Sequence, residues 1–203
     1  MKGLYLVTPD WDDTQKMLEA TEAGLRGGAT IVQYRHKTAS PELRREQASQ
    51  LQVLCRRYGR PFIINDFVEL AIELDADGIH VGGTDAAVAQ VRAAVGPSKI
   101  VGSSCYGSMQ LARDAYAAGA SYVAFGGFYP SRVKKYEVTT PPEIVAQAKK
   151  EIPVPNVVIG GMTQENSVPL VKHGADMVAV ISSVYMVDDP EAAARAFAKL
   201  FAA

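Results

Sequence analysis

The sequence predicts an α/β fold, a single (β/α)8 TIM barrel with a closed, parallel, eight-stranded sheet. Short apolar runs alternate eight times with longer amphipathic stretches rich in Ala, Leu, Glu, Gln and Arg. The runs are apolar on both faces, as expected of parallel strands that helices cover. Small residues precede several runs and polar residues follow them, which predicts a stabilising end and a functional end.

The expected strands are the eight short apolar runs. Several of them stop abruptly at polar residues, and their length suits a buried strand. They cover residues 4–7, 30–34, 62–64, 78–81, 99–102, 122–125, 157–159 and 177–181.

Between these strands lie the expected helices, whose apolar residues recur at the spacing of one helix face. Several are followed by glycine, as in Gly27-Gly28-Ala29 and His173-Gly174-Ala175, because glycine adopts the left-handed conformation that ends a helix. The expected helices cover residues 13–26, 41–58, 68–74, 86–95, 109–118, 142–150, 167–173 and 190–201.

The composition is that of one globular domain, residues 1–203, with 48% hydrophobic and 21% charged residues. Its 21 basic and 22 acidic side chains give a net charge of −1, which offers no reason to expect nucleic acid or membrane as a partner. We expect a cytoplasmic location, because Cys55 and Cys105 belong to no CxxC pair, the N-terminus resembles no signal peptide, and no apolar run approaches ~18 residues. A monomer and a homodimer are both compatible with the sequence.

Two aspartates follow neighbouring strands and predict a Mg²⁺ site. Asp66 follows the third strand and Asp85 follows the fourth, each within a few residues of the strand end. If these strands are parallel neighbours, both carboxylates emerge at the same end of the sheet, and carboxylate oxygen is a preferred ligand of Mg²⁺. Alternatively, each Asp caps the helix that follows it, since Asp is a favoured N-cap residue. The repetition of the pattern favours the metal site.

The second strand ends in Gln33, Arg35 and Lys37 at alternating positions. If the strand continues through them, an amide and two cations point toward the same centre. Arg offers a planar fork and Lys a mobile charge, and together they suit a diphosphate. The alternative is a charged strand end in solvent, paired with Glu42 or Glu69.

A second anion site is expected across the mouth of the barrel. Gly160 and Gly161 follow the seventh strand, and Ser182 and Ser183 follow the eighth. Backbone N–H groups beside glycine can approach an anion closely, and barrels commonly bind phosphate after these two strands. The position of the glycines, more than the Gly-Gly pair itself, predicts the site.

The longest irregular stretch, residues 126–141, follows the sixth strand. Long loops on a compact barrel are usually lids or binding loops. Ser131 and Lys134 in this loop are therefore candidates to close over an anion. Together with the cation pair and the carboxylate pair, this concentration of polar residues at one end predicts an enzyme.

Six motifs at the strand ends occur in order along the chain. They are Gln33-x-Arg35-x-Lys37, Asn65-Asp66, His80-x-Gly82-x-x-Asp85, Gly102-x-Ser104-Cys105-Tyr106, Phe128-Tyr129-Pro130-Ser131-x-x-Lys134 and Ile159-Gly160-Gly161-Met162. Together they resemble the thiamine phosphate synthase (thiamine-phosphate diphosphorylase) family over essentially the whole chain. The resemblance implies a Mg²⁺-dependent transferase of thiamine biosynthesis, which joins an aminopyrimidine methyl diphosphate to a thiazole phosphate and releases diphosphate.

The resemblance also implies roles for single residues on the first substrate. Four residues would hold the pyrimidine diphosphate. Three cations and a hydroxyl, two of the cations shared with that set, would act as catalytic residues on the leaving diphosphate. The first group is Gln33, Arg35, Lys37 and Asn65, and the catalytic residues are Arg35, Lys37, Ser104 and Lys134.

For the metal and the second substrate, the resemblance implies two further sets. Asp66 and Asp85 would hold Mg²⁺. The thiazole phosphate would be surrounded by Ser131, Gly161, Ile181 and Ser182.

The sequence departs from the family pattern in three places. Where the family commonly has Thr-x-Thr-Lys, Val133 removes one hydroxyl near the thiazole phosphate and Arg132 adds a cation, which we expect to compensate for it. Position 67 is Phe where the family often has Arg, and Gly83 stands where Gln is frequent. His80 and Cys105 are interpreted as packed structural residues, since neither has an evident catalytic partner in the sequence.

Two other functions are the alternatives. Thiazole tautomerase, a sister family on the same barrel, typically lacks the second metal carboxylate and carries a catalytic His where this chain has Gly127. A non-catalytic phosphate-sensing barrel would have no use for two metal carboxylates. The presence of Asp85 together with Asp66 favours the synthase over both.

Overall fold

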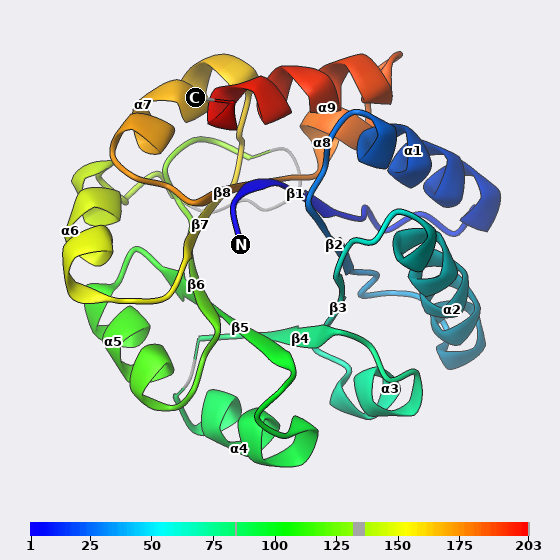
Figure 1. Ribbon diagram of the computed structural model, residues 1–203, viewed down its shortest axis with the longest axis horizontal. Coiled ribbons are helices and arrows are strands. Elements are labelled where there is room, and N and C mark those ends of the chain that lie inside the picture. Colours follow the sequence, from blue (N-terminus) through cyan, green and yellow to red (C-terminus); the bar gives the residue numbers. More distant parts are fainter. Residues whose placement is uncertain (84, 132–136, 203) are drawn as a thin grey trace.

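A computed structural model describes residues 1–83, 85–131 and 137–202 and confirms the predicted barrel. The eight strands pair in chain order, each parallel to its neighbours, and β1 pairs with β8 to close the sheet (Figure 1). The strands are β1 (Gly3–Val7), β2 (Ile31–Tyr34), β3 (Phe62–Asn65), β4 (Gly78–Val81), β5 (Ile100–Tyr106), β6 (Tyr122–Phe125), β7 (Asn156–Ile159) and β8 (Met177–Val180).

Helices form a ring around the sheet (Figure 1). Their starts follow from the sequence: Asp13 and Ser40 cap the first two by accepting hydrogen bonds from the backbone N–H groups of Lys16 and Leu43. The helices are α1 (Thr14–Arg26), α2 (Pro41–Arg57), α3 (Val68–Glu73), α4 (Asp85–Val95), α5 (Met109–Ala117), α6 (Glu143–Glu151), α7 (Gln164–Lys172), α8 (Ser182–Tyr185) and α9 (Pro190–Ala198), followed by the 3-10 turn η1 (Lys199–Phe201).

Two elements differ from the prediction. β5 runs on to Tyr106, beyond the expected end at residue 102, because Ser103 and Ser104 pair with β6 before a bulge. Their hydroxyls give this part of the strand the appearance of a loop. The short helix α8 is absent from the predicted elements, since four residues are too few to show a helical period.

The strands bury two separate sets of apolar side chains. Leu4 and Leu6 of β1 point outward and pack under the helices, whereas Tyr5 and Val7 point into the barrel. The inner set fills the barrel interior, as is usual with eight strands, so a ligand can reach only the barrel ends. It comprises Tyr5, Val7, Ile31, Ile63, Tyr122, Ala124, Val157, Met177 and Ala179.

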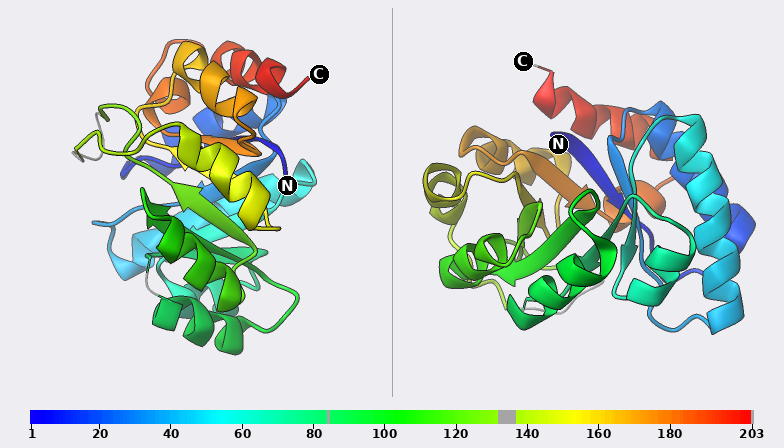
Figure 2. Two further views of the ribbon diagram at one scale, coloured as in Figure 1. Left: turned by 90° about the vertical axis from the view of Figure 1, so that its left-hand side faces the viewer. Right: turned by 60° about the horizontal axis from the view of Figure 1, so that its bottom comes forward.

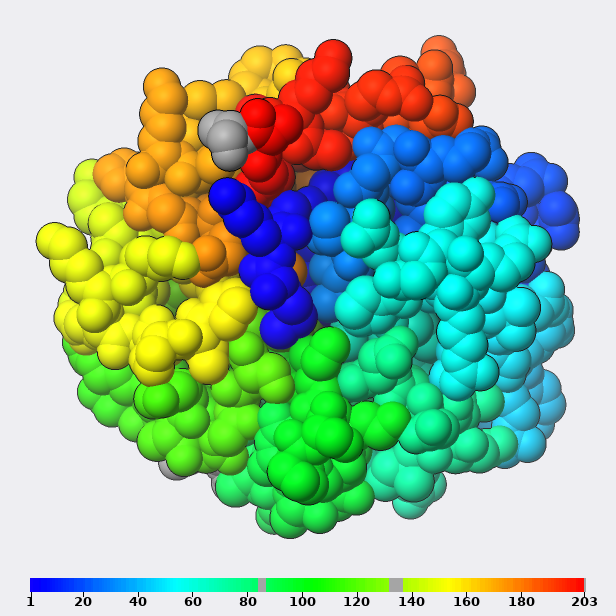
Figure 3. Space-filling view, viewed as in Figure 1, coloured from blue at the N-terminus to red at the C-terminus, as the bar shows by residue number. Residues whose placement is uncertain are grey.

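The two ends of the barrel differ in chemistry. At the amino ends of the strands, Asp77 accepts a hydrogen bond from the N–H of Phe62 at 2.8 Å, and Asp176 accepts one from Asn156 at 3.0 Å. The N-terminal residues lie across the centre of this face (Figure 3). The loop that follows β6 projects on the side opposite to the N-terminus (Figure 2, left). The carboxyl ends of the strands, on the face away from the N-terminus, are therefore where a ligand site can form.

Gly102 of β5 makes room inside the barrel for the ring of Tyr122. A Cβ at this position would lie 2.0 Å from Cζ of that ring. We therefore expect Gly102→Ala to lower the free energy of unfolding by about 1–3 kcal/mol, the usual cost of overpacking a core. Urea denaturation measures the change. Gly82→Ala, whose Cβ would meet no atom of the described residues within 4 Å, is the control, and an equal midpoint for the two variants would contradict this packing role.

Candidate active site

A central pocket lies at the carboxyl end of the barrel interior, and two others adjoin it. The central pocket is lined by strand residues that include Gln33, Asn65 and Ser104. A larger pocket, about 350 Å³ in volume, lies between the end of β5 and the loop after β6. A small one lies between the glycines after β7 and the start of α8. Ile159 lines all three, so ligands in neighbouring pockets would lie side by side.

The end of β2 brings an amide and a guanidinium to the central pocket. Gln33 and Arg35 both line it and are buried. The strand ends at Tyr34, so the condition for strand alternation through Lys37 is not met. Two hydrogen bonds with Thr8 hold the backbone of Arg35 instead. Arg35 N–H donates to the Thr8 hydroxyl at 2.8 Å, and that hydroxyl donates to Arg35 C=O at 3.1 Å.

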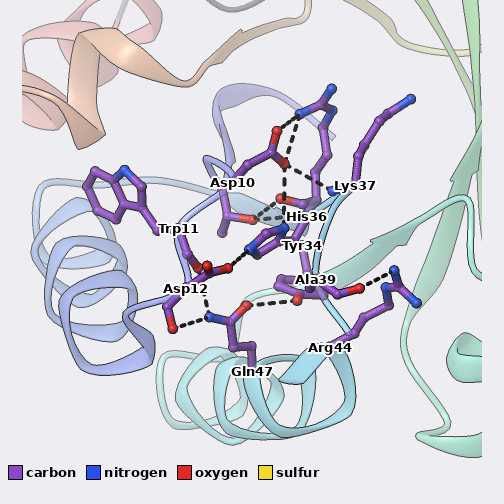
Figure 4. A network of polar contacts seen from close by, with 11 residues as sticks. Asp10, Trp11, Asp12, Tyr34, His36, Lys37, Ala39, Arg44 and Gln47 are labelled. Atoms are coloured by element: carbon purple, nitrogen blue, oxygen red, sulfur yellow. Dashed lines mark hydrogen bonds and ion pairs between the residues drawn. The ribbon is translucent and has the colours of Figure 1, made fainter. Parts of the chain in front are cut away.

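Asp10, from the loop after β1, organises the two cations (Figure 4). Its carboxylate oxygens each lie 3.4 Å from Nη1 of Arg35, and Oδ1 accepts the backbone N–H of Lys37 at 3.0 Å. Arg35 Nε is buried and has no hydrogen-bond partner among the residues that the structure describes. The partner of Arg35 is thus Asp10, where the sequence suggested Glu42 or Glu69, and the guanidinium retains a donor for a ligand.

Asp66 lies at the mouth of the barrel in a left-handed conformation, with φ +66°. Its N–H donates to the C=O of His80 at 2.9 Å, which ties the end of β3 to β4. The N-cap of α3 is Phe67, which makes no side-chain cap bond within the described chain, so the helix-cap alternative is wrong for Asp66. Non-glycine residues held in this conformation cluster at functional sites.

The nearest cation to the Asp66 carboxylate is Lys37, whose Nζ lies 3.6 Å from Oδ2. Both side chains are about half exposed, so water screens this pair and it contributes little to stability. Asp85 begins α4 after the neighbouring strand β4, as predicted for the second carboxylate. Its side chain lies outside the described part, and so do Lys134 and the compensating cation predicted at Arg132.

Ser104 is held by a residue that the sequence placed among structural ones. Its hydroxyl lies 2.8 Å from Nε2 of His80, and Nδ1 of the same ring lies 2.8 Å from the hydroxyl of Tyr122. Cys105, by contrast, is buried, and burial raises the pKa of its thiol to about 11, in keeping with its interpretation as a packed residue.

The glycine loop after β7 lies against the loop after β6. Gly161 has φ +64°, and a Cβ there would lie 2.1 Å from the C=O oxygen of Pro130. Ser131, Ile181 and Ser182 line the small pocket beside it. The structure thus brings together the four residues that the resemblance assigned to the thiazole phosphate.

Sequence reasoning missed three residues of the site. Tyr5 and Tyr122 lie in apolar runs, where an aromatic residue is an ordinary core residue, and they line the central pocket. Thr8 follows β1 and makes two hydrogen bonds with the backbone of Arg35. The one available signal was the hydroxyl of a tyrosine in a strand that is otherwise aliphatic, because a buried Tyr usually needs a hydrogen-bond partner.

The sequence model of the family described as thiamine monophosphate synthase matches residues 4–184. A thiamine-phosphate synthase from Janthinobacterium sp. is 66% identical over 202 residues, which cover 100% of this chain and 98% of the relative. The chain belongs to this family. A second thiamine-phosphate synthase, from Thiobacillus denitrificans, is 45% identical over 201 residues, 99% of this chain and 95% of the relative. The resemblance inferred from the strand-end motifs is therefore confirmed, and the chain is a thiamine-phosphate synthase and a transferase.

Solved structures agree with the family. Thiamine phosphate pyrophosphorylase from Pyrococcus furiosus superposes with a TM-score of 0.85 at 30% identity, over 98% of this chain and 94% of that one. A 3-hexulose-6-phosphate synthase superposes with a TM-score of 0.71 at 20% identity, over 98% of this chain and 99% of that one, which shows the barrel fold alone. In the described residues of this synthase, no helix combines the length and apolar character that crossing a membrane requires.

Proposed function

We propose that this synthase joins an aminopyrimidine methyl diphosphate to a thiazole phosphate, giving thiamine phosphate and diphosphate, in its adjoining pockets. The observation that carries the proposal is the grouping of Arg35, Lys37 and Asp66 at the carboxyl ends of β2 and β3, where Asp10 bonds to both cations and Lys37 lies beside Asp66. Two cations and a carboxylate free of any cap role suit a diphosphate with a metal ion better than they suit a neutral ligand. The neighbouring pockets supply space for a second substrate.

Gln33 and Asn65 are the proposed ligands of the pyrimidine. Both line the central pocket, are buried, and carry an amide, which offers a donor and an acceptor together. An aminopyrimidine presents the complementary pair, an amino N–H and a ring nitrogen. Binding there would direct the methyl diphosphate outward, toward Arg35 and Lys37.

Asp66 and Asp85 have the donor chemistry for Mg²⁺. The ion prefers carboxylate oxygens and is usually held by one or two of them plus substrate phosphate. The Asp66 carboxylate is half exposed at the mouth, and its backbone is hydrogen-bonded to the strand that precedes Asp85. Bound between these residues, Mg²⁺ would supply positive charge to the diphosphate oxygens.

In the proposed reaction, the bond between the pyrimidine methylene and the diphosphate oxygen breaks, and its electron pair leaves with the diphosphate. The methylene carbon then bonds to the thiazole ring nitrogen. Negative charge grows on the leaving group, so Arg35, Lys37, Ser104 and Lys134 act by stabilising that charge where it is most developed. No general base is needed at the methylene carbon.

For the thiazole phosphate, we propose the small pocket lined by Ser131, Gly161, Ile181 and Ser182. Gly160 and Gly161 both have positive φ, a conformation that L side chains rarely adopt. Backbone amides in such a loop can approach a phosphate closely, and this is where barrels commonly bind one.

Gly161→Ala is expected to raise the KM of the thiazole phosphate, since its Cβ would lie 2.1 Å from the C=O of Pro130 and displace the adjoining loop. Backbone strain of this kind corresponds to about 1–3 kcal/mol. The matched control is Gly160→Ala, whose φ is also positive but whose Cβ would lie 3.7 Å from the nearest atom of the described residues, the N of Gly127. Steady-state kinetics with each substrate varied in turn measures the change. Equal KM values in the two variants would contradict a role for the contact with Pro130.

The test of the proposed function is product formation from the two purified substrates with Mg²⁺. Thiamine phosphate and diphosphate should appear in equal amounts, and neither should appear when one substrate is omitted. Isomerisation of a thiazole substrate alone would instead indicate the tautomerase reaction, against which Gly127 and the names of the relatives argue. Tight phosphate binding without product would indicate a sensor.

A cytoplasmic location and action on small molecules alone are part of the proposal. Cys55 and Cys105 are free and buried, which suits a reducing compartment. The near balance of 21 basic and 22 acidic side chains supports neither nucleic acid nor an anionic membrane as partner. A monomer and a homodimer are both compatible with this site, because the pocket residues named above come from one chain.

A further inference from the structure

Five polar side chains form an unbroken hydrogen-bonded row beneath the central pocket. Gln33 Nε2 donates to the Tyr5 hydroxyl at 2.9 Å, and that hydroxyl lies 2.6 Å from the hydroxyl of Tyr122. Tyr122 continues to Nδ1 of His80 at 2.8 Å, and Nε2 of His80 to the hydroxyl of Ser104 at 2.8 Å. The row thus runs from the proposed pyrimidine ligand to the proposed diphosphate ligand. Its members come from five different strands, β2, β1, β6, β4 and β5.

Packing fixes the middle of this row. Tyr5 and Tyr122 are almost fully buried, and their rings meet edge to face at 80° with centroids 5.8 Å apart. The ring of His80 stacks on Tyr122 at 21°, with centroids 5.7 Å apart. Gly102 leaves the space that the Tyr122 ring occupies. The hydrogen-bond distances are therefore set by the register of the barrel and not by mobile side chains.

The two tyrosines stay protonated in this setting. Burial raises the pKa of Tyr5 to about 12 and raises the pKa of Tyr122 well above its usual value. A neutral phenol has a single hydrogen to donate. A buried hydroxyl that receives a hydrogen bond from one neighbour in a row must therefore give its own hydrogen to the next, or leave it unsatisfied at a cost.

The direction of one bond then determines all the others. With Gln33 Nε2 donating, Tyr5 donates to Tyr122, and Tyr122 donates to Nδ1 of His80. A neutral imidazole with Nδ1 as acceptor carries its hydrogen on Nε2 and donates to Ser104. The Ser104 hydroxyl keeps its own hydrogen for a ligand. In the reverse direction, Ser104 would donate to His80, and the oxygen of Gln33 would have to turn toward Tyr5.

We propose that Tyr5, Tyr122 and His80 are positioning residues that couple the Gln33 amide to the Ser104 hydroxyl, so that both present the orientation needed by the pyrimidine diphosphate. The proposal rests on the proposed function of the two end residues. In the direction that follows from Gln33 Nε2 as donor, Gln33 keeps its oxygen and one N–H for a ligand, which match the amino group and ring nitrogen of an aminopyrimidine. The same direction leaves Ser104 able to donate to an anionic oxygen. Recognition of the pyrimidine therefore sets the donor that faces the leaving group.

The free protein tests the row without any substrate. The chain has three histidines, so nitrogen NMR of labelled histidine can resolve His80, with His80→Asn to assign its signal. We expect the wild type to carry the hydrogen on Nε2, and both Gln33→Leu and Tyr122→Phe to give a mixture of tautomers. Tyr34→Phe is the matched control, because it removes a buried phenol hydroxyl that bonds to Gln47 outside the row. A hydrogen on Nδ1 in the wild type, or one tautomer in all variants, would overturn the proposal.

Kinetics tests the coupling. Tyr122→Phe removes the hydroxyl that bonds to Tyr5 and His80 and leaves both end residues in place. We expect it to lower kcat about tenfold, the value of one ordinary hydrogen bond, with the KM of the thiazole phosphate unchanged. In the wild-type background, the loss of kcat caused by Gln33→Ala and Ser104→Ala together should be smaller than the product of the two single losses. In the Tyr122→Phe background, the combined loss should equal that product. Multiplicative losses in both backgrounds would show that Tyr122 only packs. Because the NMR result needs no turnover, failure of this row and failure of the proposed function give different results.

Discussion

Asp66→Asn is expected to lower kcat/KM by about 100- to 1,000-fold, the usual effect of removing one electrostatic contact from a transition state. The carboxylate is half exposed just after β3 and caps no helix in the described chain, so its loss removes the proposed Mg²⁺ ligand and little else. Asn is the right replacement because it tolerates the left-handed conformation, φ +66°, in which Asp66 is held. The free energy of unfolding should therefore change little. Calorimetric titration with Mg²⁺ and diphosphate should show weakened binding.

Asp75→Asn is the matched control for this experiment. Asp75 also has a positive φ, +50°, and also pairs with a lysine, Lys99, at 2.6 Å. It lies in the turn before β4, at the opposite end of the barrel from the pocket. Its replacement should leave kcat/KM and Mg²⁺ binding unchanged. If Asp66→Asn kept full activity, or if chelator-treated wild type did, the metal assignment would be wrong.

Arg35→Lys is expected to lower kcat/KM by about 10- to 100-fold, although it conserves the charge. The guanidinium can engage Asp10 through Nη1 and still offer Nε to a ligand, because its donors form a rigid fork. The point charge of Lys cannot do both. Steady-state kinetics with the pyrimidine diphosphate varied measures the loss. The hydrogen bonds between Thr8 and the backbone at position 35 do not involve the side chain, so the fold should stay intact.

Arg45→Lys is the control for the loss of a guanidinium, since Arg45 is exposed and pairs with Glu73 on the helix surface at 2.8 Å. It should leave kinetics unchanged. Should Arg35→Lys and Arg35→Ala both retain the wild-type kcat and KM, then Arg35 serves only as a partner of Asp10, and the solvated strand end would be the correct interpretation.

The proposed residues differ in how far the sequence could assign them. Asp66 and Asp85 could be assigned from the sequence because each follows an apolar run within a few residues, and parallel strands deliver such residues to one end of a sheet. The sequence could not exclude that Asp66 caps a helix, since the backbone conformation of this residue decides the question. Arg35 was found as a cation at a strand end, but its pairing with Asp10, which comes from a different loop, was not predicted.

The barrel follows from the amino-acid pattern alone, since eight apolar runs buried on both faces, separated by amphipathic stretches, leave few other ways to cover each strand. The family follows from the sequence as well, because the strand-end motifs occur in order along the whole chain. The hydrogen-bonded row from Gln33 to Ser104 depends on the folded barrel, since Tyr5 and Tyr122 are 117 positions apart in the sequence. Closure of the barrel sets their contact, and local patterns of hydrophobicity report which side chains are buried but not which of them meet.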